Sequence, residues 1–70
     1  LVAANEGLAD LDHIVTTSRQ HLLPGGWLLV EHGWTQGEAV RALFTQAGYT
    51  AVETCRDYGG NERLTLGQWA

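Results

Sequence analysis

Two residues that could do chemistry, Glu31 and His32, directly follow an apolar stretch at residues 27–30 (Trp-Leu-Leu-Val). A carboxylate and an imidazole can transfer protons or bind a polar substrate. If residues 27–30 form a strand of an open α/β sheet, both side chains lie at its carboxyl end, the edge where such sheets bind ligands. One interpretation is that Glu31 and His32 line the rim of a substrate pocket. The interpretation we prefer is that they cap the strand end and the following loop by hydrogen bonding.

Asp57 and Arg63 form a second charged pair, on either side of a turn-like sequence at residues 58–61 (Tyr-Gly-Gly-Asn). Opposite charges across a hairpin turn can form an ion pair that fixes the turn. An exposed pair of this kind contributes only about 0–1 kcal/mol. We therefore expect Asp57 and Arg63 to be structural residues rather than substrate ligands.

The sequence does not predict a metal site. Its candidate ligands are His13, His21, His32 and Cys55. His13 and His21 are eight residues apart, and no two ligands have the i, i+4 spacing that places them on one helix face. A single cysteine cannot form an internal disulfide or a cysteine-based zinc site, so we expect Cys55 to be a small apolar strand residue.

The spacing of apolar residues predicts the elements that carry these side chains. A first helix is expected where mostly apolar residues recur at spacings of three and four and so lie on one helix face. These residues are Leu8, Leu11, Val15, Ser18 and Leu22. Asn5 or Asp10 could cap its start, and residues 23–26 (Leu-Pro-Gly-Gly) are expected to end it, because proline disfavours helical geometry in the residue before it. Residues 27–30 do not alternate between polar and apolar, so we expect a parallel-type strand buried on both faces, with helices above and below.

A second helix is expected after this strand, because Thr35 and Glu38 have the spacing of a capping box. Its apolar stripe consists of Val40, Leu43, Phe44 and Ala47. Gly48 is placed to end it in a left-handed conformation. Residues 50–56 and 64–69 have the patterns of two strands joined as a hairpin. The order helix, strand, helix, strand, strand is typical of the closing part of an α/β sheet.

The composition limits what the chain can be and bind. Seventy residues form one small domain at most, which buries only about 60% of its unfolded surface. Eight acidic residues outweigh four arginines and no lysine is present, so we do not expect binding to nucleic acid through charge. No apolar run exceeds four residues, which is too short to span a membrane. Because the sequence lacks methionine and a positively charged leader, we expect residues 1–70 to be a single fragment of a longer protein.

Four short sequences together resemble one enzyme family. They are residues 28–33 (Leu-Leu-Val-Glu-His-Gly), 36–37 (Gln-Gly), 47–49 (Ala-Gly-Tyr) and 56–63 (Arg-Asp-Tyr-Gly-Gly-Asn-Glu-Arg). In this order they resemble the C-terminal end of the HemK-type release factor (protein-glutamine-N5) methyltransferases. The resemblance covers essentially all 70 residues.

The resemblance implies a fold and a reaction. The fold is a class I S-adenosylmethionine-dependent methyltransferase domain, whose Rossmann-like sheet has seven strands, the last antiparallel beside the fifth. Residues 1–70 would form the C-terminal part of this catalytic domain. The reaction moves a methyl group from S-adenosylmethionine to the side-chain amide of glutamine in the Gly-Gly-Gln motif of peptide chain release factors. Such partners imply a cytoplasmic protein.

Three parts of the family pattern have no counterpart in this sequence. They are the glycine-rich cofactor loop, the acidic ribose-binding residue and the Asn-Pro-Pro-Tyr motif, and the only proline is Pro24. The resemblance therefore assigns no catalytic and no cofactor-binding residue here. It implies that S-adenosylmethionine binds the intact parent and not the fragment, which alone would be inactive.

Two other functions stay open. The chain could be a non-enzymatic α/β interaction module, or a fragment of a class I methyltransferase that acts on another protein or on a nucleic-acid base. An Asn-Pro-Pro-Tyr motif within a few dozen residues before Leu1 in the longer protein would favour the release factor methyltransferase. Its absence would favour one of the alternatives.

We expect the isolated 70-residue chain to self-associate, to exchange elements between copies, or to fold weakly. Loss of a neighbouring strand would leave residues 27–30 with unpaired backbone groups, which invite pairing with another chain. Light scattering and an amide NMR spectrum of the isolated chain test this expectation. A monomer with a well-dispersed spectrum and high thermal stability would contradict it.

Overall fold

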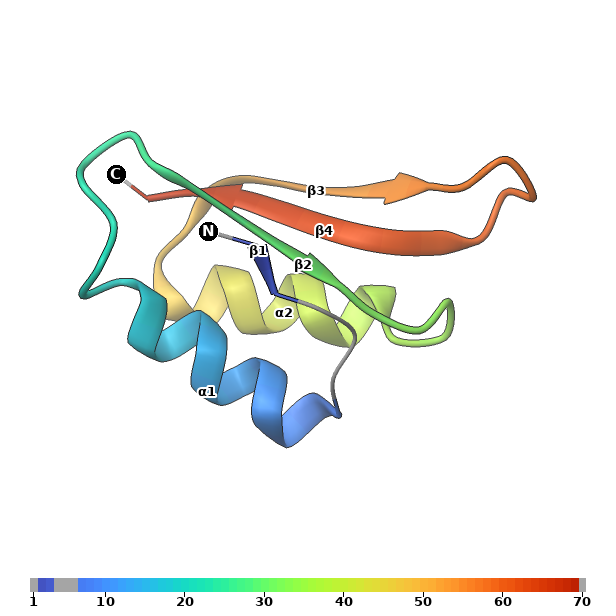
Figure 1. Cartoon of the computed structure of the whole chain (residues 1–70), viewed down its shortest axis with the longest axis horizontal. Helices are drawn as coiled ribbons and strands as arrows, with labels where there is room; N and C mark the ends of the chain where they lie inside the picture. Colours follow the sequence, from blue (N-terminus) through green and yellow to red (C-terminus); the bar gives the residue numbers. More distant parts are fainter. Residues whose placement is uncertain (1, 4–6, 70) are drawn as a thin grey trace.

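Two helices cover one face of a four-stranded sheet in the computed structural model, which describes residues 2–3 and 7–69 (Figure 1). The elements are β1 (Val2–Ala3), α1 (Leu8–Ser18), β2 (Trp27–Glu31), α2 (Gly37–Ala47), β3 (Thr50–Arg56) and β4 (Glu62–Gln68). The predicted order of helix, strand, helix, strand, strand is confirmed, and the short β1, which was not predicted, precedes it. Neither of these helices is long and apolar enough to cross a membrane.

β4 lies between β2 and β3, although it follows both in the sequence. It runs antiparallel to both neighbours, with Leu66 opposite Leu29 of β2 and Glu53 of β3. On its other side, β2 pairs in parallel with β1. The strand order is therefore β1-β2-β4-β3, and the β3–β4 pair is the predicted hairpin.

The core lies between the sheet and the two helices. It is formed by the buried residues Leu11 and Val15 of α1, Leu28 and Val30 of β2, Val40 and Phe44 of α2, and Tyr49. Full burial of an apolar side chain of this size contributes about 1.5–3 kcal/mol. The apolar stripe predicted for α2 thus faces the core, and so do Leu11 and Val15 of the stripe predicted for α1, whereas Leu8 of that stripe is exposed.

The prediction that β2 is buried on both faces is wrong for the part of the chain that the structure describes. Burial alternates along the strand, since Leu28 and Val30 are buried whereas Trp27 and Glu31 are exposed. The physical reason is that α1 and α2 pack against each other over a single core, on one side of the sheet (Figure 1). The opposite face of β2 carries Leu29, which is only half-buried.

The start of α1 differs from the prediction. Gly7 is the N-cap residue and has extended backbone geometry (φ −69°, ψ 161°). Asp10 lies inside the first turn and does not cap the helix, although its negative charge there is favourable for the helix dipole. Asn5, the other predicted cap, lies outside the described residues.

The end of α1 also comes earlier than predicted. The helix stops at Ser18, before Leu22 and before the segment at residues 23–26 that was expected to end it. A carbonyl oxygen of its last turn is bound by a side chain, because Arg19 Nε donates to the Thr16 carbonyl oxygen (2.9 Å). The next backbone N–H groups, of Gln20 and His21, donate to carbonyl oxygens three residues earlier and close tight turns instead of continuing the helix.

The capping box predicted from Thr35 and Glu38 does not form. Gln36 is the N-cap residue of α2, and no side chain caps this helix. The Oε1 atom of Gln36 instead accepts a hydrogen bond from the Gly33 backbone N–H (2.8 Å), and the Gln36 N–H donates to the Gly33 carbonyl oxygen (3.0 Å). These bonds close a tight turn before the helix. At the other end, Gly48 is left-handed (φ 98°), as predicted.

Gly67→Ala should lower the free energy of unfolding by about 1–3 kcal/mol, the usual cost of overfilling a core. A Cβ at this position of β4 would lie 2.6 Å from Phe44 Cδ2 and 3.1 Å from Tyr49 Cβ. Denaturant unfolding measures the change. The control is Phe44→Leu, because a smaller side chain should make the same glycine substitution less costly. An equal cost in both backgrounds would show that close packing of α2 on β4 is not the cause.

Candidate functional site

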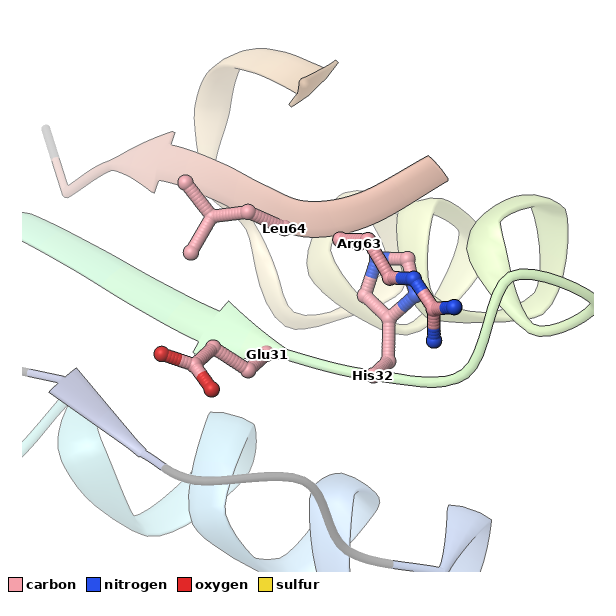
Figure 2. Close-up of a pocket in the computed structure, with 4 residues that line it drawn as sticks. All are labelled: Glu31, His32, Arg63 and Leu64. Atoms are coloured by element: carbon pink, nitrogen blue, oxygen red, sulfur yellow. The ribbon is translucent and has the colours of Figure 1, made fainter. Parts of the chain in front are cut away.

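A surface hollow of about 350 Å³ lies at the carboxyl end of β2 (Figure 2). Its lining residues are Glu31, His32, Arg63 and Leu64. The pairing of β2 with β4 brings them together: Glu31 lies opposite Leu64, and the His32 backbone N–H donates to the Arg63 carbonyl oxygen (2.9 Å). The structure thus joins both residues predicted as a substrate rim with one of the two predicted as structural.

Glu31 presents a carboxylate at this hollow. The side chain is exposed, and within the described residues it makes no hydrogen bond or ion pair. It points away from the His32 ring (Figure 2), and Leu64, the cross-strand partner of Glu31 on β4, lies on the same face of the sheet. A free carboxylate beside an apolar side chain can accept hydrogen bonds from the amide or cationic groups of a ligand.

His32 is used differently, because its side chain is only 1% exposed. Its Nδ1 atom lies 2.9 Å from the Gly33 carbonyl oxygen, and its Nε2 atom lies 2.8 Å from Thr65 Oγ1. A carbonyl oxygen can only accept, so Nδ1 carries a hydrogen and donates it. The ring therefore ties the loop after β2 to β4, which is the hydrogen-bonding role that we preferred.

Asp57 and Arg63 meet across the β3–β4 turn, where Arg63 Nε lies 3.3 Å from Asp57 Oδ2. The other carboxylate oxygen, Oδ1, accepts hydrogen bonds from the backbone N–H groups of Gly59 (2.9 Å) and Asn61 (3.0 Å). The bond from Asn61 is the main cause that holds the pKa of Asp57 below its ordinary value of 3.8, and Arg63 adds to it. The carboxylate thus organises the turn that leads into β4, whose residue Arg63 lines the hollow.

A polar network that the sequence analysis missed extends from His32 into the sheet. Thr65 Oγ1, which binds the His32 ring, also lies 2.8 Å from Thr54 Oγ1. Arg41 Nη1 donates to Thr54 Oγ1 (2.9 Å) and to Glu62 Oε2 (3.1 Å). The signal that could have revealed this network is a threonine at a buried position of β4, since a buried hydroxyl needs a hydrogen-bond partner.

The described residues contain no group of three potential metal ligands close enough to hold an ion. His13 and His21 are exposed, in α1 and in the turn after it. His32 is buried under the hollow with both ring nitrogens engaged. Cys55 lies in β3, as expected, but it is exposed rather than packed as an apolar residue.

The sequence is similar to release factor glutamine methyltransferases over nearly its whole length. It is 65% identical to that of Salmonella typhimurium over 69 residues, 64% identical to that of Escherichia coli over 69 residues, and 57% identical to that of Pseudomonas aeruginosa over 70 residues. No protein-family model matches the chain.

The chain spans about a quarter of the length of these curated relatives. Each of the three alignments covers 99% or 100% of this chain but 25% of the relative. The matching segment is the C-terminal part of the relatives. The family resemblance inferred from the sequence is therefore confirmed for this segment.

Asp57→Asn should destabilise the β3–β4 hairpin at neutral pH and have little effect near pH 2. Folding lowers the pKa of Asp57, so its ionised form stabilises the folded state above the unfolded pKa, and this contribution is lost as the pH falls through the folded value. Denaturant unfolding of both proteins at the two pH values measures the difference. Asp12→Asn, on the exposed side of α1, serves as the control. A difference that does not change with pH would contradict the assignment.

Proposed function

We propose that this chain, which matches the C-terminal part of release factor glutamine methyltransferases, is part of such an enzyme. The enzyme would transfer a methyl group from S-adenosylmethionine to the side-chain amide of glutamine in the Gly-Gly-Gln motif of peptide chain release factors, in the cytoplasm. The observation that carries the proposal is the 65% identity that extends over 99% of the chain. Residues 1–70 would form one continuous part of its catalytic domain.

The topology supports this proposal. In the implied Rossmann-like sheet, the last strand lies antiparallel beside the fifth. Here β4 is antiparallel to β2 and separates it from β3. We infer that β2, β3 and β4 are the fifth, sixth and seventh strands of that sheet.

The described residues do not fit S-adenosylmethionine. A glycine-rich cofactor loop leaves backbone N–H groups and open space for its ligand, and the two glycines that follow β2 offer neither. The Gly33 N–H donates to Gln36, and a Cβ at Gly37 would overlap the Glu62 carboxylate, which fills the space beside it. We therefore assign cofactor binding to the part of the enzyme outside this chain.

The contribution of this chain to the reaction is to position the substrate. A side-chain amide nitrogen is a weak nucleophile because its lone pair is delocalised, so the enzyme must orient the amide and the peptide around it. The Glu31 carboxylate, which has no hydrogen-bond partner among the described residues, would accept hydrogen bonds from the substrate peptide at the carboxyl edge of the sheet. His32 would not contact the substrate itself but would hold the loop after β2 through its hydrogen bond to Gly33.

The test uses the full-length protein that contains this chain. We expect it to bind S-adenosylmethionine in a calorimetric titration and to methylate a purified release factor at the Gly-Gly-Gln glutamine, as read by mass spectrometry. Glu31→Gln should raise the KM for the release factor about tenfold, as expected for one lost charge-assisted hydrogen bond. The affinity for S-adenosylmethionine should not change.

Glu38→Gln, at an exposed position of α2, is the matched control and should leave the KM unchanged. Absence of methyl transfer to any release factor would overturn the proposed substrate. Binding of S-adenosylmethionine to the isolated 70-residue chain would overturn the assignment of the cofactor site to the rest of the enzyme. An unchanged KM in Glu31→Gln would remove Glu31 from the substrate rim.

A further inference from the structure

The polar network around His32 has two chemically fixed ends. At one end, Arg41 Nη1 lies 2.9 Å from Thr54 Oγ1, and a guanidinium can only donate. At the other end, His32 Nδ1 lies 2.9 Å from the Gly33 carbonyl oxygen, which can only accept. Between them stand two hydroxyl groups, Thr54 and Thr65, each with one hydrogen to donate.

With Nδ1–H donating to Gly33, the bare Nε2 atom must accept from Thr65, and this sets the direction of the hydrogen bonds back to Arg41. Thr54 accepts from Arg41, so its own hydrogen is free to go to Thr65 Oγ1 (2.8 Å). Thr65 then donates to His32 Nε2 (2.8 Å), and Nδ1–H donates to the Gly33 carbonyl oxygen. All bonds point from α2 towards the end of β2, and each donor has an acceptor.

The other protonation states of the ring fit less well. If the hydrogen were on Nε2, the Nδ1 lone pair would face the Gly33 carbonyl oxygen at 2.9 Å, and two acceptors would meet. If both nitrogens carried hydrogen, Thr65 would accept from Nε2–H, so one of the two threonine hydrogens would have no acceptor within this network. A buried polar group without a partner is unfavourable. The geometry therefore selects a neutral ring with its hydrogen on Nδ1.

The acceptor at the end of this network belongs to the loop between β2 and α2, residues 33–36. The Gly33 carbonyl oxygen also accepts from the Gln36 N–H (3.0 Å), and the Gly33 N–H donates to Gln36 Oε1 (2.8 Å). Both backbone groups of Gly33 are thus fixed, next to Trp34, whose side chain is 59% exposed. The loop follows directly on Glu31 and His32, which line the hollow.

We infer that His32 is a positioning residue: Arg41, acting through Thr54 and Thr65, holds its ring as the neutral Nδ1–H form, and that ring fixes loop 33–36 for contact with the protein substrate. The structural half of this inference stands on the hydrogen bonds alone. The half that concerns the substrate rests on the proposed function. The two halves have separate tests.

The first test is ¹⁵N NMR of the histidine side chains in the full-length protein, with His32→Asn used to assign the signal. We expect a protonated Nδ1 and an unprotonated Nε2. Thr65→Val keeps the side-chain shape and removes the hydroxyl, so the Nε2 signal should move to the position of a nitrogen without a hydrogen bond, whereas Thr65→Ser should retain the wild-type position. If Thr65→Val does not fold, Thr54→Val at its half-buried position removes the link to Arg41 and should shift the same signal by a smaller amount. A wild-type ring protonated on Nε2, or an unchanged Nε2 signal in both valine variants, would overturn the inference.

The second test is the kinetics of methyl transfer to the release factor. Thr65→Val should raise the KM for the release factor about 3-fold to 10-fold, as for one lost neutral hydrogen bond, with kcat and the affinity for S-adenosylmethionine unchanged. Thr65→Ser should restore the KM, and Thr16→Val, at an exposed position of α1, should have no effect. An unchanged KM in Thr65→Val would overturn the role towards the substrate. If the wild-type protein does not methylate a release factor, the proposed function fails, while the NMR result still decides how the ring is held.

Discussion

The position of β4 between β2 and β3 is the constraint on which the other contacts depend. Its buried positions, Thr65 and Gly67, face the core, and the missing side chain of Gly67 makes room for Phe44 of α2. Its first residues supply one wall of the hollow and the carboxylate of Glu62 that binds Arg41. Since one strand provides all of these groups, a shift of its register by one residue would remove them together.

The buried polar groups show how the hollow and the core are joined. Within the described residues, no buried side-chain nitrogen or oxygen lacks a hydrogen-bond partner. His32 and Thr65 are buried at the edge of an otherwise apolar core, and they satisfy each other. A satisfied network in a low-dielectric setting has one favoured arrangement. The loop after β2 therefore takes its shape from residues of α2, β3 and β4, and those of β3 and β4 lie far from it in sequence.

Local patterns in the sequence predicted most of the fold and part of the site. The stripe of α2, the left-handed Gly48 and the hairpin depend on neighbouring residues, and the structure contains all three. Glu31 and His32 were found because they end an apolar run. The capping box of α2 failed because Gln36 closes a turn with Gly33 instead. The partners of His32 could not be predicted. Thr65 is 33 residues away in the sequence, and only the register between β2 and β4 brings the two side chains together.

The insertion of β4 also sets the order in which the protein can mature during synthesis. The ribosome completes β2 and β3 before it makes β4, yet these two strands are not neighbours in the finished sheet. The gap between them stays open until residues 62–68 have left the exit tunnel. Their pairing with β2 is a long-range event, which is slow compared with local helix formation. Until then, β2 and β3 each expose the strand edge that β4 will later pair with, and it is in this interval that a chaperone would be of most use.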